Sequence, residues 1–254
     1  MTMLVCCYSP PIPIRSFTDI VASIFELQQA HAYMIKTKLI NDTFAASRLV
    51  AFAATNSDLP TIAYAHSIFS RIKYPNAYIW NVMIRAYASS PDPVHALLIF
   101  NQMLHSCGVV PDKYTYPFVL KACSGVGGLG EGRQVHGHAV KRGIKADIYV
   151  YNSLISMYAR SGCFDIARKL LDKMLLRDVI SWNALLSGYV DKGLMGSAQQ
   201  LFDEMEERNA ESWNFLISGY VKAGLIEEAR KLFDEMNVKN VVSWNSLMTG
   251  VCSC

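Results

Sequence analysis

Apolar residues recur with helical spacing in two successive blocks, and this layout repeats along the second half of the chain. In residues 210–240, the first block places four residues at i, i+4, i+7 and i+8, which is one face of a helix: Trp213, Ile217, Tyr220 and Val221. Gly224 interrupts the pattern, as glycine does at a helix C-terminus. The second block again has its apolar residues on one face: Leu225, Ile226, Ala229, Leu232, Phe233 and Met236. Each unit therefore predicts a pair of helices, with the same layout in 148–178 and 179–209.

These helical pairs form an internal repeat. Four first helices begin almost identically, with an aromatic residue, Asn, a third residue and Leu, at 151–154, 182–185, 213–216 and 244–247. Their asparagines are 31 residues apart, and a related start at Trp80 lies two units upstream. Segment 27–42 also matches segment 132–147 position by position at an offset of 105 residues, which places another unit at 43–76 with Ser47 in the asparagine position.

A single hairpin cannot bury both of its apolar faces, so neighbouring hairpins are expected to stack. The predicted fold is all-α: a right-handed superhelical α-solenoid of stacked helix-turn-helix repeats with a concave surface. The expected units are about 16–42, 43–76, 77–112, 113–147, 148–178, 179–209 and 210–240, with a partial unit at 241–254, preceded by a targeting segment or disordered N-terminus at 1–15.

Composition narrows the function without deciding it. Apolar residues make up 52% of the chain, and the net charge of +3 permits nucleic-acid binding without demanding it. No apolar run approaches the ~18–20 residues of a membrane span, so no membrane association is expected. The seven cysteines are odd in number and include no C-x-x-C pair, which indicates reduced thiols in an intracellular compartment.

Nothing in the sequence predicts an enzyme, a metal site or a cofactor. The six histidines show no zinc-ligand spacing and are interpreted as ordinary helix residues. The glycine-rich segment 125–130 lies where two helices of one unit join, so it is interpreted as a turn rather than a phosphate-binding loop.

Two of the repeat strings resemble the pentatricopeptide repeat family: VISWNALLSGYVDKGLMGSAQQLFDEMEERN at 179–209 and ESWNFLISGYVKAGLIEEARKLFDEM at 211–236. The mixed unit lengths are similar to those of the land-plant subclass with long and short repeats, and the resemblance covers roughly 16–254. It implies a solenoid that binds organellar single-stranded RNA for editing, splicing or stability of transcripts, with processing proteins recruited in trans. A deaminase constellation is missing, and the chain stops at Cys254 midway through a first helix, so we expect a truncated form.

Asparagine is unfavourable inside helices, yet it occupies the same early position in five first helices: Asn81, Asn152, Asn183, Asn214 and Asn245. Its amide offers a donor and an acceptor, which suits the edge of an unstacked base. The alternative is that each amide bonds a neighbouring backbone group or reinforces a turn. The residues that close the units are also regular and are good helix N-caps, a role that can coexist with base reading: Asn76, Asp112, Asp147, Asp178, Asn209 and Asn240.

The resemblance implies that each early residue and the closing residue of its unit together choose one base. Carried over, Asn81 with Asp112 and Asn152 with Asp178 would favour uracil. Asn183 with Asn209 and Asn214 with Asn240 would favour a pyrimidine, cytosine first, and Ser47 with Asn76 would favour adenine. Pro117 with Asp147 offers no side-chain amide in the early position and is expected to be a spacer. The implied RNA site, from 5′ to 3′, is A-U-any-U-Y-Y.

Two further features have competing interpretations. The rings of Trp80, Trp182, Trp213 and Trp244 invite a base-stacking role, but their apolar periodicity favours core packing. The presumed groove repeats one small amide, whereas a protein-binding scaffold, the rival function, predicts varied aromatic and charged anchors.

The first 18 residues contain no acid and one arginine, Arg15, which is weakly compatible with an organellar transit segment. With the family resemblance, we expect an organellar location, mitochondrion slightly favoured over chloroplast.

Overall fold

The structure is a computed structural model that describes residues 24–55, 59–144 and 147–251. In these ranges it contains α-helices and one short 3-10 helix, Leu39–Asn41, and no strand. The predicted all-α fold of stacked helical hairpins is therefore confirmed. The expected segment 1–15 and the beginning of the unit at 16–42 lie outside the described residues.

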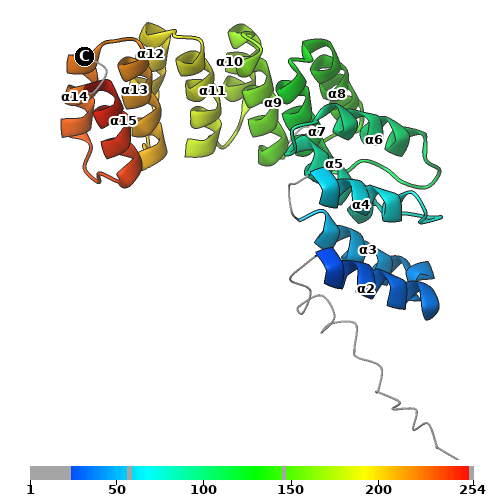
Figure 1. The fold of residues 1–254 in the computed structure, drawn as a ribbon. Coiled ribbons are helices and arrows are strands. Elements are labelled where there is room, and N and C mark those ends of the chain that lie inside the picture. Colours follow the sequence, from blue (N-terminus) through cyan, green and yellow to red (C-terminus); the bar gives the residue numbers. More distant parts are fainter. Residues whose placement is uncertain (1–23, 56–58, 145–146, 252–254) are drawn as a thin grey trace, which may run out of the picture. The chain divides into compact units, whose positions relative to one another are not determined.

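The chain divides into two compact units, Met1–Pro111 and Asp112–Cys254. The first unit contains α2 (Ile24–Lys36), α3 (Thr43–Ala53), α4 (Leu59–Phe69), α5 (Ala77–Ala88) and α6 (Val94–His105), drawn from blue to green in Figure 1. The second unit contains α7 (Thr115–Val126), α8 (Leu129–Lys141), α9 (Ile148–Arg160), α10 (Phe164–Lys173), α11 (Val179–Asp191), α12 (Met195–Glu204), α13 (Ala210–Lys222), α14 (Ile226–Glu235) and α15 (Val241–Val251).

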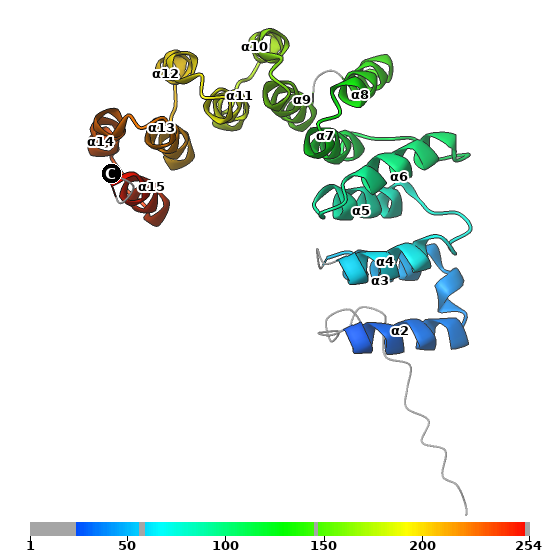
Figure 2. The same cartoon turned by 45° about the horizontal axis from the view of Figure 1, so that its top comes forward.

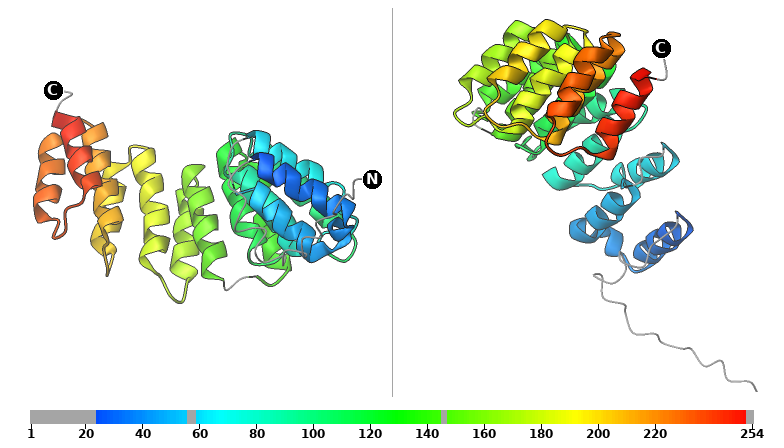
Figure 3. Two further views of the ribbon diagram at one scale, coloured as in Figure 1. Left: turned by 60° about the horizontal axis from the view of Figure 1, so that its bottom comes forward. Right: turned by 90° about the vertical axis from the view of Figure 1, so that its left-hand side faces the viewer.

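In the second unit the helices alternate between two rows. Helices α7, α9, α11, α13 and α15 form one row, and α8, α10, α12 and α14 form the other (Figure 2). Each first helix packs on the first helix of the next hairpin, and the helices of this unit stand side by side in the further views (Figure 3). The row of first helices therefore presents a continuous surface of equivalent positions.

The closing residues of the predicted units cap the first helices. Asp178 Oδ1 accepts a hydrogen bond from the Ser181 amide (2.8 Å), and Asn209 Oδ1 accepts one from the Ser212 amide (2.9 Å). Equivalent side-chain bonds to backbone amides are made by Asn76, Asp112, Asp147 and Asn240. The predicted N-cap role is confirmed for Asn76, Asp147, Asp178, Asn209 and Asn240, which fix where their helices begin. Before α7 the N-cap position belongs to Tyr114, and Asp112 bonds the amides of Tyr114 and Thr115 from the preceding turn.

Glycine and a basic residue terminate the helices. Gly162, Gly193 and Gly224 follow the first helices with φ of 78°, 70° and 75°, a left-handed conformation that glycine adopts without steric cost. Gly127 does the same after α7, so the segment 125–130 is a turn only at its centre: Gly125 lies in the last turn of α7 and Gly130 in the first turn of α8.

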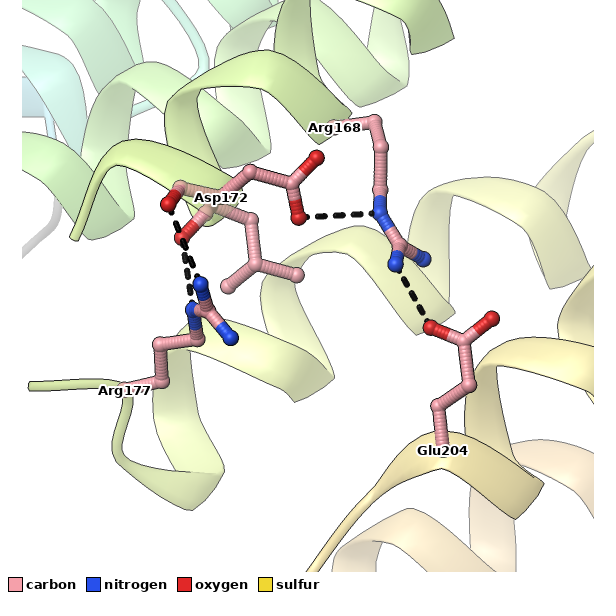
Figure 4. A network of polar contacts seen from close by, with 5 residues as sticks. Arg168, Asp172, Arg177 and Glu204 are labelled. Carbon is pink, nitrogen blue, oxygen red and sulfur yellow. Dashed lines mark hydrogen bonds and ion pairs between the residues drawn. The ribbon is translucent and has the colours of Figure 1, made fainter.

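Three second helices, α10, α12 and α14, are followed by a basic side chain that comes just before the closing residue. The Arg177 guanidinium donates to the carbonyl oxygens of Leu171 and Asp172 at the end of α10, both at 3.0 Å (Figure 4). Arg208 and Lys239 make the corresponding bonds at the ends of α12 and α14. A cation at a helix C-terminus also interacts favourably with the helix dipole. Each of these three basic side chains therefore stabilises its helix end through hydrogen bonds and through the charge–dipole interaction.

Tryptophan rings pack against the preceding second helix. Trp80 and Trp182 are buried, and Trp80 meets Phe69 edge-on at 4.8 Å between ring centroids. Trp213 meets Phe202 in the same way and is half-buried, whereas Trp244 meets Phe233 but is 52% exposed. Core packing is thus confirmed for Trp80 and Trp182, and it is only partial for the two later rings.

Histidines and tyrosines form a repeated contact that the sequence interpretation did not include. His66 Nδ1 lies 3.2 Å from the Tyr87 hydroxyl, and His136 Nδ1 lies 2.9 Å from the Tyr158 hydroxyl, each pair joining a second helix to the first helix of the next hairpin. Burial lowers the pKa of both histidines and raises the pKa of both tyrosines. Among the residues placed by the structure, no cluster of three metal-ligating side chains occurs, and no helix there has the length and apolar character needed to cross a bilayer.

Candidate nucleic-acid interface

A groove of about 430 Å³ runs along the first helices of the second unit. Residues from α7, α9, α11 and α13 line it, including Pro117, Lys121, Asn152, Arg160 and Asn183. A second groove, of about 690 Å³, lies between α13 and α15 and is lined by Asn214 and Asn240 among others. The predicted early residues of four successive units therefore lie along one surface, with Pro117 offering no amide.

Each of three early asparagines contacts the closing residue of its own unit. Asn183 Nδ2 donates to Asn209 Oδ1 at 3.2 Å. Asn152 Nδ2 donates to Asp178 Oδ1 at 3.5 Å. The third pair, Asn214 Nδ2 and Asn240 Oδ1, is 3.4 Å apart. The structure thus brings together three of the pairs that the sequence predicted, and base reading by them stays a prediction.

A serine completes the first two pairs. The Ser181 hydroxyl lies 2.7 Å from Asn152 Oδ1 and 2.6 Å from Asp178 Oδ1, and the Ser212 hydroxyl lies 2.8 Å from Asn183 Oδ1 and 3.0 Å from Asn209 Oδ1. A hydroxyl has one proton, so it donates to one of these oxygens at a time. The proton position in each cluster can therefore respond to what the amide contacts.

The third pair differs in its serine. The Ser243 hydroxyl donates to the Asn240 carbonyl oxygen at 2.8 Å instead of to the amide, and Asn214 Oδ1 is buried with no hydrogen-bond partner among the described residues. A buried acceptor without a partner costs about 1–3 kcal/mol, so a ligand that donates a hydrogen bond to Asn214 Oδ1 would recover this free energy.

These contacts argue against the alternative that the early amides bond neighbouring backbone groups. The early amides of Asn152, Asn183 and Asn214 bond side chains at the start of the next hairpin rather than neighbouring backbone groups. They are held in place across a repeat boundary, and Asn183 is only 5% exposed.

The remaining predicted residues have simpler surroundings. Asn81 is half-buried on α5, and Asp112 begins the second unit, where its side chain accepts from the Thr115 amide at the start of α7. Ser47 is buried, and its hydroxyl donates to the Phe44 carbonyl oxygen of its own helix at 2.6 Å. Asn76 caps α5, and Asn245 is exposed on α15.

One set of surface residues was not predicted from the sequence. The residue two places after each closing residue is a large apolar side chain that is 56–68% exposed: Phe44, Tyr78, Tyr114, Tyr149, Ile180 and Val242. The signal was present in the sequence as an apolar position outside the buried helix face. Glu211 is the exception, because it places a carboxylate where the other units have an apolar side chain.

The charges near the first groove are mixed. Lys121 and Arg160 line it together with Glu211. Cations on the neighbouring first helices α7 and α9 suit a phosphate backbone, whereas the carboxylate does not.

Comparison with known proteins supports the repeat assignment. Sequence models described as "PPR repeat" match residues 149–179 and 211–241, and those described as "PPR repeat family" match residues 75–125 and 177–212, so the matches together cover more than half of the chain. A pentatricopeptide repeat-containing protein of Arabidopsis thaliana is 56% identical over 172 residues, which are 68% of this chain and 31% of the relative. A chloroplastic pentatricopeptide repeat-containing protein of the same plant is 44% identical over 166 residues, covering 65% of this chain and 22% of the relative.

Solved structures of the same architecture also match. The maize pentatricopeptide repeat protein PPR10 superimposes with a TM-score of 0.53 at 17% identity, over 94% of this chain and 41% of that one. Its complex with an 18-nt psaJ RNA element gives a TM-score of 0.51 over 97% of this chain and 43% of that one. This similarity shows the fold alone, and the chain spans less than a third of the length of the two Arabidopsis relatives. The repeated motifs, the stacked hairpins and the family matches agree: the chain belongs to the pentatricopeptide repeat family.

Proposed function

We propose that this chain binds single-stranded RNA, with one base facing each pair of early and closing residues. The observation that carries the proposal is the row of amide pairs along the first helices, with Asn152 and Asn183 in the first groove and Asn214 in the second. An amide held by fixed neighbours is a suitable partner for the Watson–Crick edge of an unstacked base. A protein-binding groove has no reason to repeat one amide at a constant spacing.

The other groove residues fit the same ligand. Ile180, which lines the first groove, and exposed apolar side chains at the same position of other repeats, such as Tyr149, offer surfaces on which bases can stack. Lys121 and Arg160 offer charge to phosphates. We therefore assign the base edge to the amide pair, the base face to the apolar position and the backbone to the cations.

The preferred sequence follows the pairs in chain order, 5′-A-U-any-U-Y-Y-3′, with uracil opposite Asn152 and Asp178 and a pyrimidine opposite Asn183 and Asn209. We propose that binding serves RNA processing or modification in an organelle, and that the chain acts as a binding protein whose catalysis comes from proteins recruited in trans. Relatives named as chloroplastic, or as chloroplastic/mitochondrial, support an organelle without favouring the mitochondrion.

The test changes one closing residue into the one that the next unit already has. Asp178→Asn makes the pair with Asn152 identical to the pair of Asn183 with Asn209, and asparagine is as good an N-cap as aspartate, so α11 keeps its start. We expect the preference at the fourth nucleotide to move from uracil towards cytosine by about 1–3 kcal/mol. Fluorescence anisotropy on RNAs that differ only at this nucleotide measures the change.

Asp234→Asn on the outer helix α14 removes the same charge away from the groove and is the matched control. A folded Asp178→Asn protein with an unchanged preference would make the pair a structural element only. Failure of the unsubstituted protein to prefer single-stranded RNA over duplex RNA would favour the protein-binding scaffold instead.

A further inference from the structure

The cluster around Asn183 differs from its neighbours by one carboxylate. Glu211 Oε2 accepts a hydrogen bond from Asn183 Nδ2 at 3.3 Å, and both residues line the first groove. At the equivalent place beside Asn152, the side chain is that of Ile180, which cannot accept a hydrogen bond. The chain thus contains two nearly identical sites, one with and one without an added acceptor.

With the carboxylate in place, both Nδ2 protons of Asn183 are already donated. Of the two Nδ2 protons, one is directed to Asn209 Oδ1 (3.2 Å) and the other to Glu211 Oε2 (3.3 Å), while Oδ1 lies 2.8 Å from the Ser212 hydroxyl. An amide has only two protons to donate. A base that reaches this site must therefore take a proton that Glu211 now accepts, and it meets the carboxylate when it does so.

The exposed position of Glu211 makes it the first group at this site that a ligand meets. Glu211 is exposed, whereas Asn183 beneath it is 5% exposed. No lysine or arginine within the described ranges forms an ion pair with Glu211, so its oxygens stay available as acceptors.

The chemistry of the bases then separates the two pyrimidines. Cytosine presents an exocyclic amino group, which can donate to a carboxylate while its ring nitrogen or O2 accepts from the Asn183 amide. Uracil presents the O4 carbonyl at the same place, where two acceptors would face each other across a desolvated contact. We infer that Glu211 is a specificity-determining residue that selects an amino-bearing base, cytosine over uracil, at the nucleotide facing Asn183 and Asn209.

This inference rests on the proposed RNA binding and adds the rejection of uracil by a group outside the amide pair. The resemblance implies that the amide pair alone admits either pyrimidine, cytosine first. The carboxylate strengthens this preference for cytosine, because specificity improves when a wrong ligand meets repulsion.

The experiment exchanges the two side chains that distinguish the sites. Glu211→Ile gives the Asn183 site the residue of the Asn152 site, and Ile180→Glu makes the reverse change. Both positions are exposed, so the fold is expected to survive, which melting curves check. Glu227→Gln on α14 removes an acid outside the groove and serves as the charge control. Binding is measured on single-stranded RNAs of the site 5′-A-U-A-U-Y-Y-3′ in which the fourth, fifth or sixth nucleotide alone is varied.

We expect Glu211→Ile to reduce the ratio of cytosine to uracil affinity at the fifth nucleotide by about tenfold, mainly by improving binding of uracil. Glu211→Gln, whose amide both donates and accepts, should reduce the ratio less. Ile180→Glu should raise the ratio at the fourth nucleotide, and Glu227→Gln should leave every ratio unchanged.

An unchanged ratio in folded Glu211→Ile overturns the inference, and a change at the sixth nucleotide instead of the fifth overturns the assignment to Asn183. If Asp178→Asn still shifts the preference at the fourth nucleotide, the proposed function survives either result. An unsubstituted protein that binds none of these RNAs removes the proposed function and the inference together.

Discussion

Single side chains in this chain serve two hairpins at once. Asp178 and Asn209 hold the first backbone amides of the helix that follows them and also accept from an asparagine in the preceding hairpin. His136 likewise belongs to α8 but bonds the Tyr158 hydroxyl of α9. Stability and the geometry of the groove therefore depend on the same few polar atoms.

The pairing of His136 with Tyr158 predicts a pH dependence of stability. Burial, with a smaller contribution from Lys173, lowers the pKa of His136 in the folded state, so the unfolded chain takes up the proton first, near its usual pKa of about 6.5. The free energy of unfolding is then at its full value above this pH and falls as the pH drops towards the lowered folded-state pKa. His31, His66 and His138 have pKa values shifted in the same direction, so their effects add.

His136→Gln isolates this contribution, because Gln199 already makes the equivalent bond with Tyr220 at 3.0 Å in a later repeat. We expect its thermal midpoint to fall less between pH 7 and pH 5 than that of the unsubstituted protein, measured by circular dichroism. Parallel curves for the two proteins would show that the folded state protonates His136 as readily as the unfolded chain does.

The sequence did not predict which polar side chains of the next hairpin bond the early asparagines. The asparagines and closing residues were found because each breaks a local expectation at a fixed interval. Ser212 and Glu211 were missed, because an early polar residue in a helix is common and its bond to Asn183 spans 29 or 28 residues of sequence. Only the stacking of hairpins brings these groups together.

At the scale of helices, close approach depends on glycine. A Cβ atom at Gly188 of α11 would lie 2.5 Å from the Ala159 Cβ and 3.1 Å from its backbone carbon on α9. Such distances require the two helices to move apart, since backbone cannot rotate away as a long side chain can. The absence of a side chain at Gly188 therefore sets the spacing of neighbouring first helices.

Gly188→Ala is expected to lower the free energy of unfolding by about 1–2 kcal/mol, since overpacking outweighs the better helix propensity of alanine. Gly196→Ala on α12 is the control, because a Cβ atom there meets nothing within 4 Å and the substitution should be neutral or stabilising. Urea denaturation of both variants measures the difference. Equal effects at the two positions would show that propensity, not helix spacing, governs Gly188.

The helices themselves were predictable because their signals are local. Apolar spacing, a capping residue at the start and a left-handed glycine at the end all lie within or directly beside one helix, as Asn209 and Gly224 illustrate for α13. The half-burial of Trp213 was not predictable in this way, because periodicity gives the direction of a side chain but not how completely its neighbours cover it.

At the scale of the whole molecule, each of the two units is a series of hairpins. Within each unit the helices make their extensive contacts inside their own hairpin and with the adjoining hairpins. A linear stack of this kind behaves as a sum of repeat stabilities and nearest-neighbour interfaces. Damage to one hairpin should therefore remain near it.

Trp213→Ala tests this distribution. The ring packs edge-on against Phe202 at 4.8 Å and is half-buried, so its loss should cost about 2 kcal/mol, less than for a fully buried ring. Hydrogen exchange should accelerate first in α12, α13 and α14, while α3 to α6 keep their protection. Uniform loss of protection along the chain would indicate one cooperative unit instead.

The serine and the N-cap that complete the amide clusters of Asn152 and Asn183 lie across the boundary between hairpins, and this has a consequence for how such arrays diverge. Asn152 contacts Asp178 and Ser181, which come after the hairpin that carries it. A recombination that joins hairpins from two different arrays at this boundary keeps every internal cluster intact and assembles one hybrid cluster at the joint. Each crossover thus creates one new combination of early asparagine, closing residue and serine, and it leaves the order of all the other clusters unchanged.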